Sequence, residues 1–181
     1  MGCNDSQMEE HNIIITNPPT KSYKIIIIGN KAVGKTSIIN RIMWNTYDSK
    51  IQPSYSNACS YKRVSLSTGE SLNLDIWDIT KDADFKIHLS NAKFGILVID
   101  TTSEESITNS VHWADELAQN QVKFCIAANK VDKFNKNLVK EIRSIANDYK
   151  CLMIESSAKT GYGINTILDI IVLNLLNSRL L

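Results

Sequence analysis

The chain has 181 residues, with 20 Lys and Arg against 19 Asp and Glu, and a formal net charge of +1. This length fits one domain with a full hydrophobic core, and the balanced charge excludes a strong electrostatic footprint for nucleic acid. The four cysteines have neither metal-ligand spacing nor disulfide-scaffold density. No apolar run reaches the roughly 20 residues of a membrane span.

The N-terminus carries an acylation signal. Its first six residues, Met-Gly-Cys-Asn-Asp-Ser, match M-G-x-x-x-[ST], which predicts N-myristoylation at Gly2. Cys3 is placed for S-palmitoylation, and this second chain matters because one myristoyl chain gives only marginal, reversible membrane binding. An unmodified start remains the alternative. We expect residues 1–21 to be a flexible tether and residues 22–181 to form one domain.

A phosphate-binding loop follows the first predicted strand. Four isoleucines after Lys24 are typical of a strand buried on both faces, and the residues Gly29 to Thr36 match G-x-x-x-x-G-K-[ST]. The glycines let main-chain N–H groups point at phosphate oxygens, Lys35 supplies a cation to the β- and γ-phosphates, and the Thr36 hydroxyl can ligate Mg²⁺. The predicted phosphate contacts come from Asn30, Lys31, Ala32, Val33, Gly34, Lys35, Thr36 and Ser37.

The next segments alternate between helix, loop and hairpin. Isoleucines at helical spacing predict a helix over 34–44, and residues 45–57 read as a loop. Strands are predicted at 64–66 and 72–78, joined by a turn. Asp78 ends the second strand, where an acidic residue near a phosphate loop is expected to hold Mg²⁺ through water. A turn-forming or helix-capping aspartate is the alternative.

The second half alternates strands and helices. A short, weak helix is expected within 79–91, strands at 94–100, 122–129 and 151–155, and helices ending near Asn120, over 135–149 and over 164–178. In the helix before Asn120 the residues expected to face inward are Ile107, Val111, Ala114, Leu117 and Ala118. Cys125 and Cys151 are expected to be inert core thiols. This alternation predicts an α/β fold with a mostly parallel sheet covered by helices on both faces.

Two further motifs complete a family pattern. Asn129-Lys130-Val131-Asp132 and Ser157-Ala158-Lys159 each follow a predicted strand. Together with the phosphate loop they resemble the Ras superfamily of small GTPases over about residues 23–178. The resemblance implies a P-loop NTPase of the small G domain type, with a six-stranded, mostly parallel sheet and one antiparallel edge strand. It also implies GTP or GDP as ligand, together with Mg²⁺.

The resemblance assigns a guanine site to these two motifs. Asp132 would accept hydrogen bonds from guanine N1–H and its exocyclic amine, and adenine would leave this carboxylate unpaired. Asn129 and Lys130 would frame the ring, and Ser157, Ala158 and Lys159 would complete the pocket. A P-loop kinase or ATPase is a competing hypothesis, which a guanine-selective motif argues against.

Within the superfamily the chain looks like Rab proteins, particularly the Rab5-like group. The phosphate loop, Ile76-Trp77-Asp78 and the Glu155 to Thr160 segment carry this likeness. Rabs normally end in prenylated cysteines, whereas this chain has no cysteine after Cys151, so acyl groups on Gly2 and Cys3 would replace that anchor. The resemblance implies a monomer on the cytoplasmic face of an endomembrane or the plasma membrane. Its partners there would be effector and regulator proteins of vesicle traffic.

The switch segments depart from the family pattern. Tyr47 stands at the position of an aromatic that covers the guanine. Ser54 stands where the family has a threonine that ligates Mg²⁺, and because it keeps the hydroxyl we expect it to retain this contact. A plain turn at Pro53-Ser54 is the alternative. Lys81 replaces the glycine that reads the γ-phosphate, and Asp82 replaces the glutamine that orients the attacking water. A carboxylate there is repelled by the γ-phosphate and lacks the paired donor and acceptor of an amide. Lys31 replaces a small residue.

These departures predict intrinsic GTP hydrolysis at or below about 10⁻⁴ s⁻¹, the scale of an unassisted small GTPase. Two interpretations of the lysines remain open. Lys31 and Lys81 point to solvent in one, and in the other a lysine acts in cis as a cation on the γ-phosphate, so that Lys31 joins Lys35 and Asp82 as a catalytic candidate. The alternative function is a pseudo-GTPase, a scaffold that holds nucleotide without cycling.

Overall fold

A computed structural model describes residues 21–51, 57–79, 85–133 and 136–178. Its strands form one six-stranded sheet in the order β2-β3-β1-β4-β5-β6. They are β1 (Ser22–Ile28), β2 (Ala58–Ser65), β3 (Ser71–Asp78), β4 (Phe94–Asp100), β5 (Phe124–Asn129) and β6 (Leu152–Glu155). The β2–β3 pair is antiparallel and the other pairs are parallel. The predicted fold class, including the antiparallel edge strand, is therefore confirmed.

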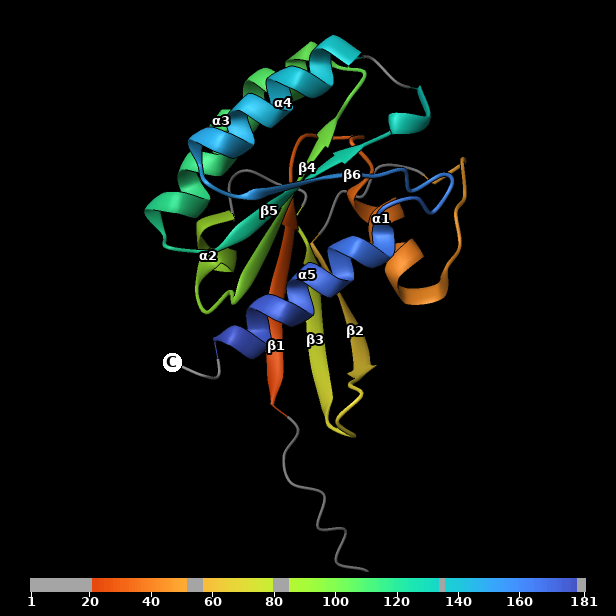
Figure 1. Ribbon diagram of the computed structural model, residues 1–181, viewed down its shortest axis with the longest axis vertical. Helices are drawn as coiled ribbons and strands as arrows, with labels where there is room; N and C mark the ends of the chain where they lie inside the picture. The colour runs from red at the N-terminus through yellow and green to blue at the C-terminus, as the bar shows by residue number, and fades with distance from the viewer. Residues whose placement is uncertain (1–20, 52–56, 80–84, 134–135, 179–181) are drawn as a thin grey trace, which may run out of the picture.

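Helices cover both faces of the sheet (Figure 1). One face carries α1 (Lys35–Trp44) and α5 (Ile164–Asn177), and the other carries α2 (Phe85–Leu89), α3 (Glu104–Gln119) and α4 (Lys136–Asp148). A 3-10 helix, η1 (Val131–Lys133), follows β5. The isoleucines of β1 explain this two-sided core. Ile25 and Ile27 pack with α1 and α5, whereas Ile26 and Ile28 pack with the α3 and α4 side, because successive side chains of a strand point to opposite faces.

Strand β2 is longer than its sequence indicates. The predicted strand at 64–66 is wrong in extent, because pairing with β3 begins at Ala58 and continues to Ser65. This edge strand carries Ser60, Lys62 and Arg63 and buries little, so it lacks the apolar pattern that a sequence reading detects. Backbone pairing with β3, and not a pattern in its own side chains, defines the extent of β2.

The inward face of α3 was predicted with the wrong phase at two positions. Val111 and Ala118 are exposed, whereas Ser110 and Trp113 are buried together with Ile107, Ala114 and Leu117. The stripe follows positions 107, 110, 114 and 117, which is the usual helical spacing. Sequence reading favoured apolar residues over a serine, but the Ser110 hydroxyl is satisfied by donating to the Ile107 carbonyl at 2.6 Å.

The remaining elements match the predicted ones within one or two residues at their ends. Helix α1 begins at Lys35, with Gly34 as its N-cap. Cys125 is fully buried as predicted, but Cys151 is only half-buried. Burial raises the pKa of both thiols, to about 11 for Cys151. Ordinary protein thiols ionise near pH 8.5, so both are poor nucleophiles at neutral pH.

The phosphate loop after β1, the end of β3 at Asp78 and the segments that follow β5 and β6 lie at one edge of the sheet (Figure 1). Parallel strands bring their carboxyl ends to the same edge, which is where open α/β sheets place their ligand sites. No helix within the described residues is long and apolar enough to cross a membrane.

Candidate functional site

The phosphate loop can close only with glycines at its two ends. Gly29 has φ +134°, and a Cβ there would lie 2.2 Å from the Val98 carbonyl oxygen. Gly34 has φ +103°, and a Cβ there would lie 2.3 Å from the Nδ2 atom of Asn129. Side chains rarely adopt such φ values. The loop therefore packs its backbone directly on β4 at one end and on the end of β5 at the other.

Lys35 folds back over the loop. Only 7% of it is exposed, and its Nζ donates to the carbonyls of Gly29 at 2.7 Å and Asn30 at 2.9 Å. The ammonium is thus held by main-chain oxygens at the start of the phosphate loop, and α1, with the positive end of its dipole, begins at Lys35 itself. This arrangement places a cation beside the position that an anion bound by the loop would occupy.

Thr36 and Asp78 form a second polar pair beside the loop. The Thr36 hydroxyl donates to Asp78 Oδ2 at 2.5 Å, and Asp78 is only 3% exposed. Its other oxygen, Oδ1, is buried and accepts no hydrogen bond from the described residues. Burial raises the pKa of Asp78, which the hydrogen bond from Thr36 and the charge of Lys35 partly oppose.

This pair fits the oxygen chemistry of Mg²⁺. The Thr36 hydroxyl donates its hydrogen to Asp78 Oδ2, so the lone pairs of the Thr36 oxygen remain available to a metal. Asp78 Oδ1 is an acceptor that receives no hydrogen bond from the described residues. Mg²⁺ takes one or two protein oxygens and keeps waters and phosphates as its other ligands. The part of the chain that the structure describes holds no cluster of three or more His, Cys, Asp or Glu placed for a metal, so the pair would act together with a bound phosphate.

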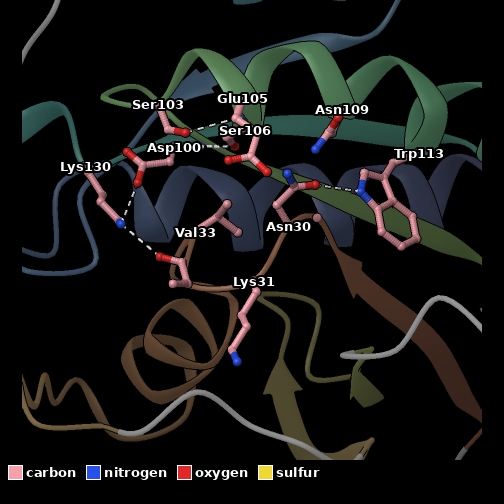
Figure 2. A pocket seen from close by; sticks show the side chains of 12 residues that line it. Asn30, Lys31, Val33, Asp100, Ser103, Glu105, Ser106, Asn109, Trp113 and Lys130 are labelled. Atoms are coloured by element: carbon pink, nitrogen blue, oxygen red, sulfur yellow. Dashed lines mark hydrogen bonds and ion pairs between the residues drawn. The ribbon is translucent and has the colours of Figure 1, made fainter.

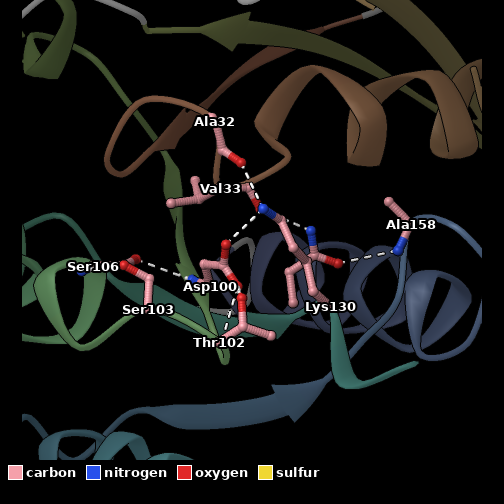
Figure 3. A network of polar contacts seen from close by, with 9 residues as sticks. Ala32, Val33, Asp100, Thr102, Ser103, Ser106, Lys130 and Ala158 are labelled. Carbon is pink, nitrogen blue, oxygen red and sulfur yellow. Dashed lines mark hydrogen bonds and ion pairs between the residues drawn. The ribbon is translucent and has the colours of Figure 1, made fainter. Parts of the chain in front are cut away.

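Asn129 joins the phosphate loop to the loop after β6. Its side chain is 1% exposed. Its Nδ2 donates to the Val33 carbonyl at 2.8 Å, and its Oδ1 accepts from the Ala158 N–H at 3.0 Å. Figure 3 shows the contact with Ala158 beside the Lys130 network. One amide therefore fixes the spacing between two loops that lie far apart in the sequence.

Lys130 braces the same loops from the other side. Its Nζ donates to the Ala32 carbonyl at 2.8 Å and pairs with Asp100 Oδ2 at 2.5 Å (Figure 3). Asp100 ends β4, and its Oδ1 accepts from the N–H and the hydroxyl of Thr102. The lysine charge is thus neutralised where it crosses the phosphate loop. Asp100 was not predicted as a site residue, although its position at the end of a buried strand, like that of Asp78, could have indicated it.

Asp132 lies in η1 with its carboxylate held at both oxygens. Its Oδ1 accepts from the Ser157 hydroxyl at 2.6 Å, and its Oδ2 lies 3.8 Å from Lys159 Nζ. Ser157 is fully buried, and its oxygen also accepts from the Thr160 N–H at 3.2 Å. The NKxD segment and the Ser157-Ala158-Lys159 segment therefore meet, as sequence reading predicted they would.

A pocket of about 600 Å³ lies between the phosphate loop and α3 (Figure 2). The indole Nε1 of Trp113 donates to Asn30 Oδ1 at 3.1 Å at one side of it. Trp113 is buried. Lys31 is exposed, and Figure 2 shows its side chain extending away from α3.

Several predicted site residues are separate from this cluster or outside the described residues. Ser37 follows Thr36 in the first turn of α1 and is partly exposed, and Tyr47 is 39% exposed in the segment after α1. The predicted site residues Gly2, Cys3, Ser54, Lys81 and Asp82 lie outside the described residues. Sequence reading missed Arg41, whose guanidinium contacts the loop after β6, because no local motif marks it.

A strand–loop–helix phosphate cradle, joined by Asn129 and Lys130 to a second loop system, defines a P-loop nucleotide-binding α/β domain. The family model described as "Ras: Ras family" matches residues 24–177. The chain belongs to the Ras family, and it is a Rab-like small GTP-binding protein within that superfamily.

Two curated proteins show the similarity. A "Probable Rab-related GTPase" of Acanthamoeba polyphaga mimivirus is 29% identical over 155 residues, covering 80% of this chain and 72% of that protein. "GTP-binding protein YPT53" of Saccharomyces cerevisiae is 27% identical over 172 residues, covering 87% of this chain and 76% of that protein. The similarity thus extends over most of both relatives.

Proposed function

We propose that the protein binds GTP and GDP with Mg²⁺ as a slow Rab-like GTPase of membrane traffic. The observation that carries this proposal is the Asn129 side chain, which bonds the phosphate loop at Val33 and the second loop at Ala158. A ligand with a phosphate chain at one end and a base at the other would span these two loops. A nucleotide has that shape.

Guanine is the base that the second loop favours. The Asp132 carboxylate is fixed by Ser157 and Lys159, so it would meet the guanine N1–H and amine without reorganising. Adenine does not present a pair of adjacent donors at that edge, so it would not make the two hydrogen bonds that guanine makes to this carboxylate. This argues against ATP as the ligand.

The metal would be held by Thr36 and Asp78 together with the nucleotide. When bound, Mg²⁺ neutralises charge on the phosphates and orients them. The chain supplies the rest of the chemistry. The Lys35 ammonium would lie against the phosphates, and the loop N–H groups would orient them. Asp78 accepts the Thr36 hydroxyl hydrogen, which would leave the lone pairs of the Thr36 oxygen available to the metal.

Binding is tested first on purified protein. We expect it to retain GDP or GTP and to gain thermal stability with GDP and Mg²⁺ but not with ADP and Mg²⁺. Asp132→Ala should lose most of the GDP-dependent gain. Asp169→Ala, an exposed aspartate on α5, is the matched control and should keep it. Empty protein that neither guanine nucleotide stabilises would refute the proposal.

Hydrolysis is expected to be slow because the chain carries Lys81 and Asp82 at the family's Gly and Gln positions. A single-turnover assay with pre-bound GTP should give a rate at or below about 10⁻⁴ s⁻¹. Asp82→Gln should raise this rate, since an amide can both donate to and accept from the attacking water. A wild-type rate well above that scale would contradict impaired hydrolysis. If Lys31→Gly then lowered this high rate, the result would support Lys31 as the cation that acts in cis on the γ-phosphate.

Membrane attachment is proposed to depend on acyl groups at Gly2 and Cys3. Full-length protein made in a eukaryotic cell should float with liposomes, Gly2→Ala should remain in the soluble fraction, and Cys3→Ser should bind weakly and reversibly. Myristoylation measured by mass spectrometry at Gly2 is the direct check. Wild-type protein that carries no lipid and does not float would contradict this proposal without affecting nucleotide binding.

A further inference from the structure

Arg41 of α1 contacts a loop that no sequence motif connects to it. Its Nε donates to the Ala158 carbonyl at 2.7 Å, and its Nη2 donates to the Lys159 carbonyl at 2.7 Å. Its Nη1 donates to the Asn45 carbonyl at 2.7 Å and lies 3.3 Å from Asn45 Oδ1. Figure 1 shows α1 beside the segment that leads from β6 to α5.

The contacts use the two edges of the guanidinium differently. Nε and Nη2 form one edge and bridge two successive carbonyls, while Nη1 binds back to the C-cap of its own helix. Each is a charge-assisted hydrogen bond, stronger than a neutral one. A rigid planar fork suits two adjacent carbonyls, whereas a lysine ammonium is a point charge on a flexible stem.

The peptide that Arg41 holds belongs to the proposed base pocket. In a trans peptide the C=O and N–H point in opposite directions, so the bond to the Ala158 carbonyl directs the Lys159 N–H away from Arg41. The N–H of Ala158 is fixed from another side by Asn129 Oδ1 at 3.0 Å. Arg41 and Asn129 therefore clamp the same residue, one through its carbonyl and one through its N–H.

The other end of the contact network leads toward Tyr47. Asn45 has φ +53° and caps α1 by donating its N–H to the Arg41 carbonyl. Arg41 thus ties the segment that carries Tyr47 to the loop that carries Ala158 and Lys159, and it does so from the helix that begins with Lys35. Two segments of the proposed base pocket share one guanidinium.

We propose that Arg41 is a positioning residue for guanine recognition, which holds the Ala158–Lys159 wall in its binding geometry. This inference rests on the proposed function. Arg41 does not contact the nucleotide itself; it acts through the two carbonyls it binds. Without it the loop must reorder when the base binds, and that ordering cost appears as faster nucleotide release.

The test measures release of a fluorescent GDP analogue from full-length Arg41→Ala, Arg41→Lys and wild type. Arg143→Ala is the matched control, because Arg143 bonds the Glu155 carboxylate at 3.0 Å at the end of β6 rather than a pocket carbonyl. We expect Arg41→Ala to release GDP about 10- to 100-fold faster, the scale of one or two lost charged hydrogen bonds. Arg143→Ala should stay within about twofold of wild type.

A second condition separates positioning from general loosening. Release is repeated with EDTA, which removes Mg²⁺ and accelerates release in every variant. Because the wall and the phosphate site are distinct, the Arg41→Ala factor should be the same with and without Mg²⁺. Arg41→Lys keeps the charge but loses the fork, so its release rate should lie closer to that of Arg41→Ala than to wild type. If Arg41→Ala does not fold, the lysine variant carries the comparison.

Three results would overturn the inference. They are equal release from Arg41→Ala and Arg143→Ala, full rescue by lysine, and an Arg41→Ala effect that disappears in EDTA. Wild-type protein that binds no GDP would instead refute the proposed function, and the inference with it. Wild-type protein that binds GDP normally while the Arg41 variants behave like it would refute the inference alone.

Discussion

At the scale of single residues, Asp78 is the buried acid whose environment most opposes its charge. Burial raises its pKa above the usual value for a carboxyl group. The folded protein therefore binds more protons than the unfolded chain between the two pKa values. Stability of the nucleotide-free protein falls as pH rises through that window, and the loss is complete above the folded-state pKa. Such a cost is expected of a residue kept for a ligand.

Replacing Asp78 by Asn should therefore separate stability from metal binding. We expect Asp78→Asn to raise the free energy of unfolding of the nucleotide-free protein at pH 7, with the difference from wild type shrinking as pH is lowered. It should also abolish the extra thermal stability that Mg²⁺ adds to the GDP complex. Asp75→Asn, on the same strand but half-exposed, is the control. Unchanged Mg²⁺ dependence in Asp78→Asn would show that this carboxylate does not serve the metal.

Gly34 is the residue where backbone and side-chain constraints coincide. Gly34→Ala must strain a φ of +103° and displace Asn129 Nδ2, which lies 2.3 Å from the new Cβ. Gly69→Ala is a close control, because Gly69 has φ +85° with nothing within 4 Å of its Cβ position. Both should lose about 1–3 kcal/mol of stability from the backbone.

Only Gly34→Ala should also lose the GDP-dependent thermal shift, because it breaks the Asn129 bond to Val33. Differential scanning fluorimetry with and without GDP measures both effects. A Gly34→Ala protein that keeps the full shift would mean that the Asn129 contact does not control the site.

At the scale of elements, α3 shows how a helix start positions the pocket beside the phosphate loop. Ser103 caps the helix by accepting from the Ser106 N–H at 3.2 Å, and Glu104 and Glu105 follow in the first turn. Acidic side chains at the N-terminus of a helix interact favourably with the positive end of its dipole. The helix also carries Trp113, which bonds Asn30, so its first turn and its middle both contribute to that pocket.

Ser103→Ala should cost about 1 kcal/mol of stability because the cap bond is lost. Thr108→Ala is the control on the same helix. The Thr108 hydroxyl bonds back to the Glu104 carbonyl at 3.1 Å, and alanine is the better helix former, so this change should be neutral or slightly stabilising. Urea unfolding of both variants measures the difference. An equal effect of the two changes would remove Ser103 from the role of cap.

The elements also show where sequence reading ends. The buried strands β1 and β4 were predictable because a strand covered on both faces is apolar at every position. The edge strand β2 was underestimated because exposure leaves its side chains without a pattern. The phase of α3 was misjudged at Val111 and Ala118 because burial of Ser110 depends on a local hydrogen bond.

At the scale of the whole molecule, the property to test is whether the bound nucleotide, GDP or GTP, changes the order of the segments within residues 50–90. Small GTPases signal when the γ-phosphate and Mg²⁺ order two such segments. If this chain cycles as a switch, hydrogen exchange over residues 50–90 should be slower with a GTP analogue than with GDP. Exchange over β4 and β5 should be equal in both states, which provides the internal control. Equal exchange over residues 50–90 would contradict the switch and point to a nucleotide-stabilised scaffold.

The sequence by itself determined the phosphate loop, the NKxD and Ser157-Ala158-Lys159 segments and the alternating α/β order. Each is written in a contiguous stretch of chain, where spacing and side-chain chemistry are visible together. Only the tertiary structure decided that Asp100 pairs with Lys130, that Asp78 keeps an oxygen without a partner, and that Arg41 holds carbonyls more than a hundred positions away. Contacts to main-chain carbonyls leave no trace in residue type, because every residue offers the same carbonyl and only the fold selects which one is reached.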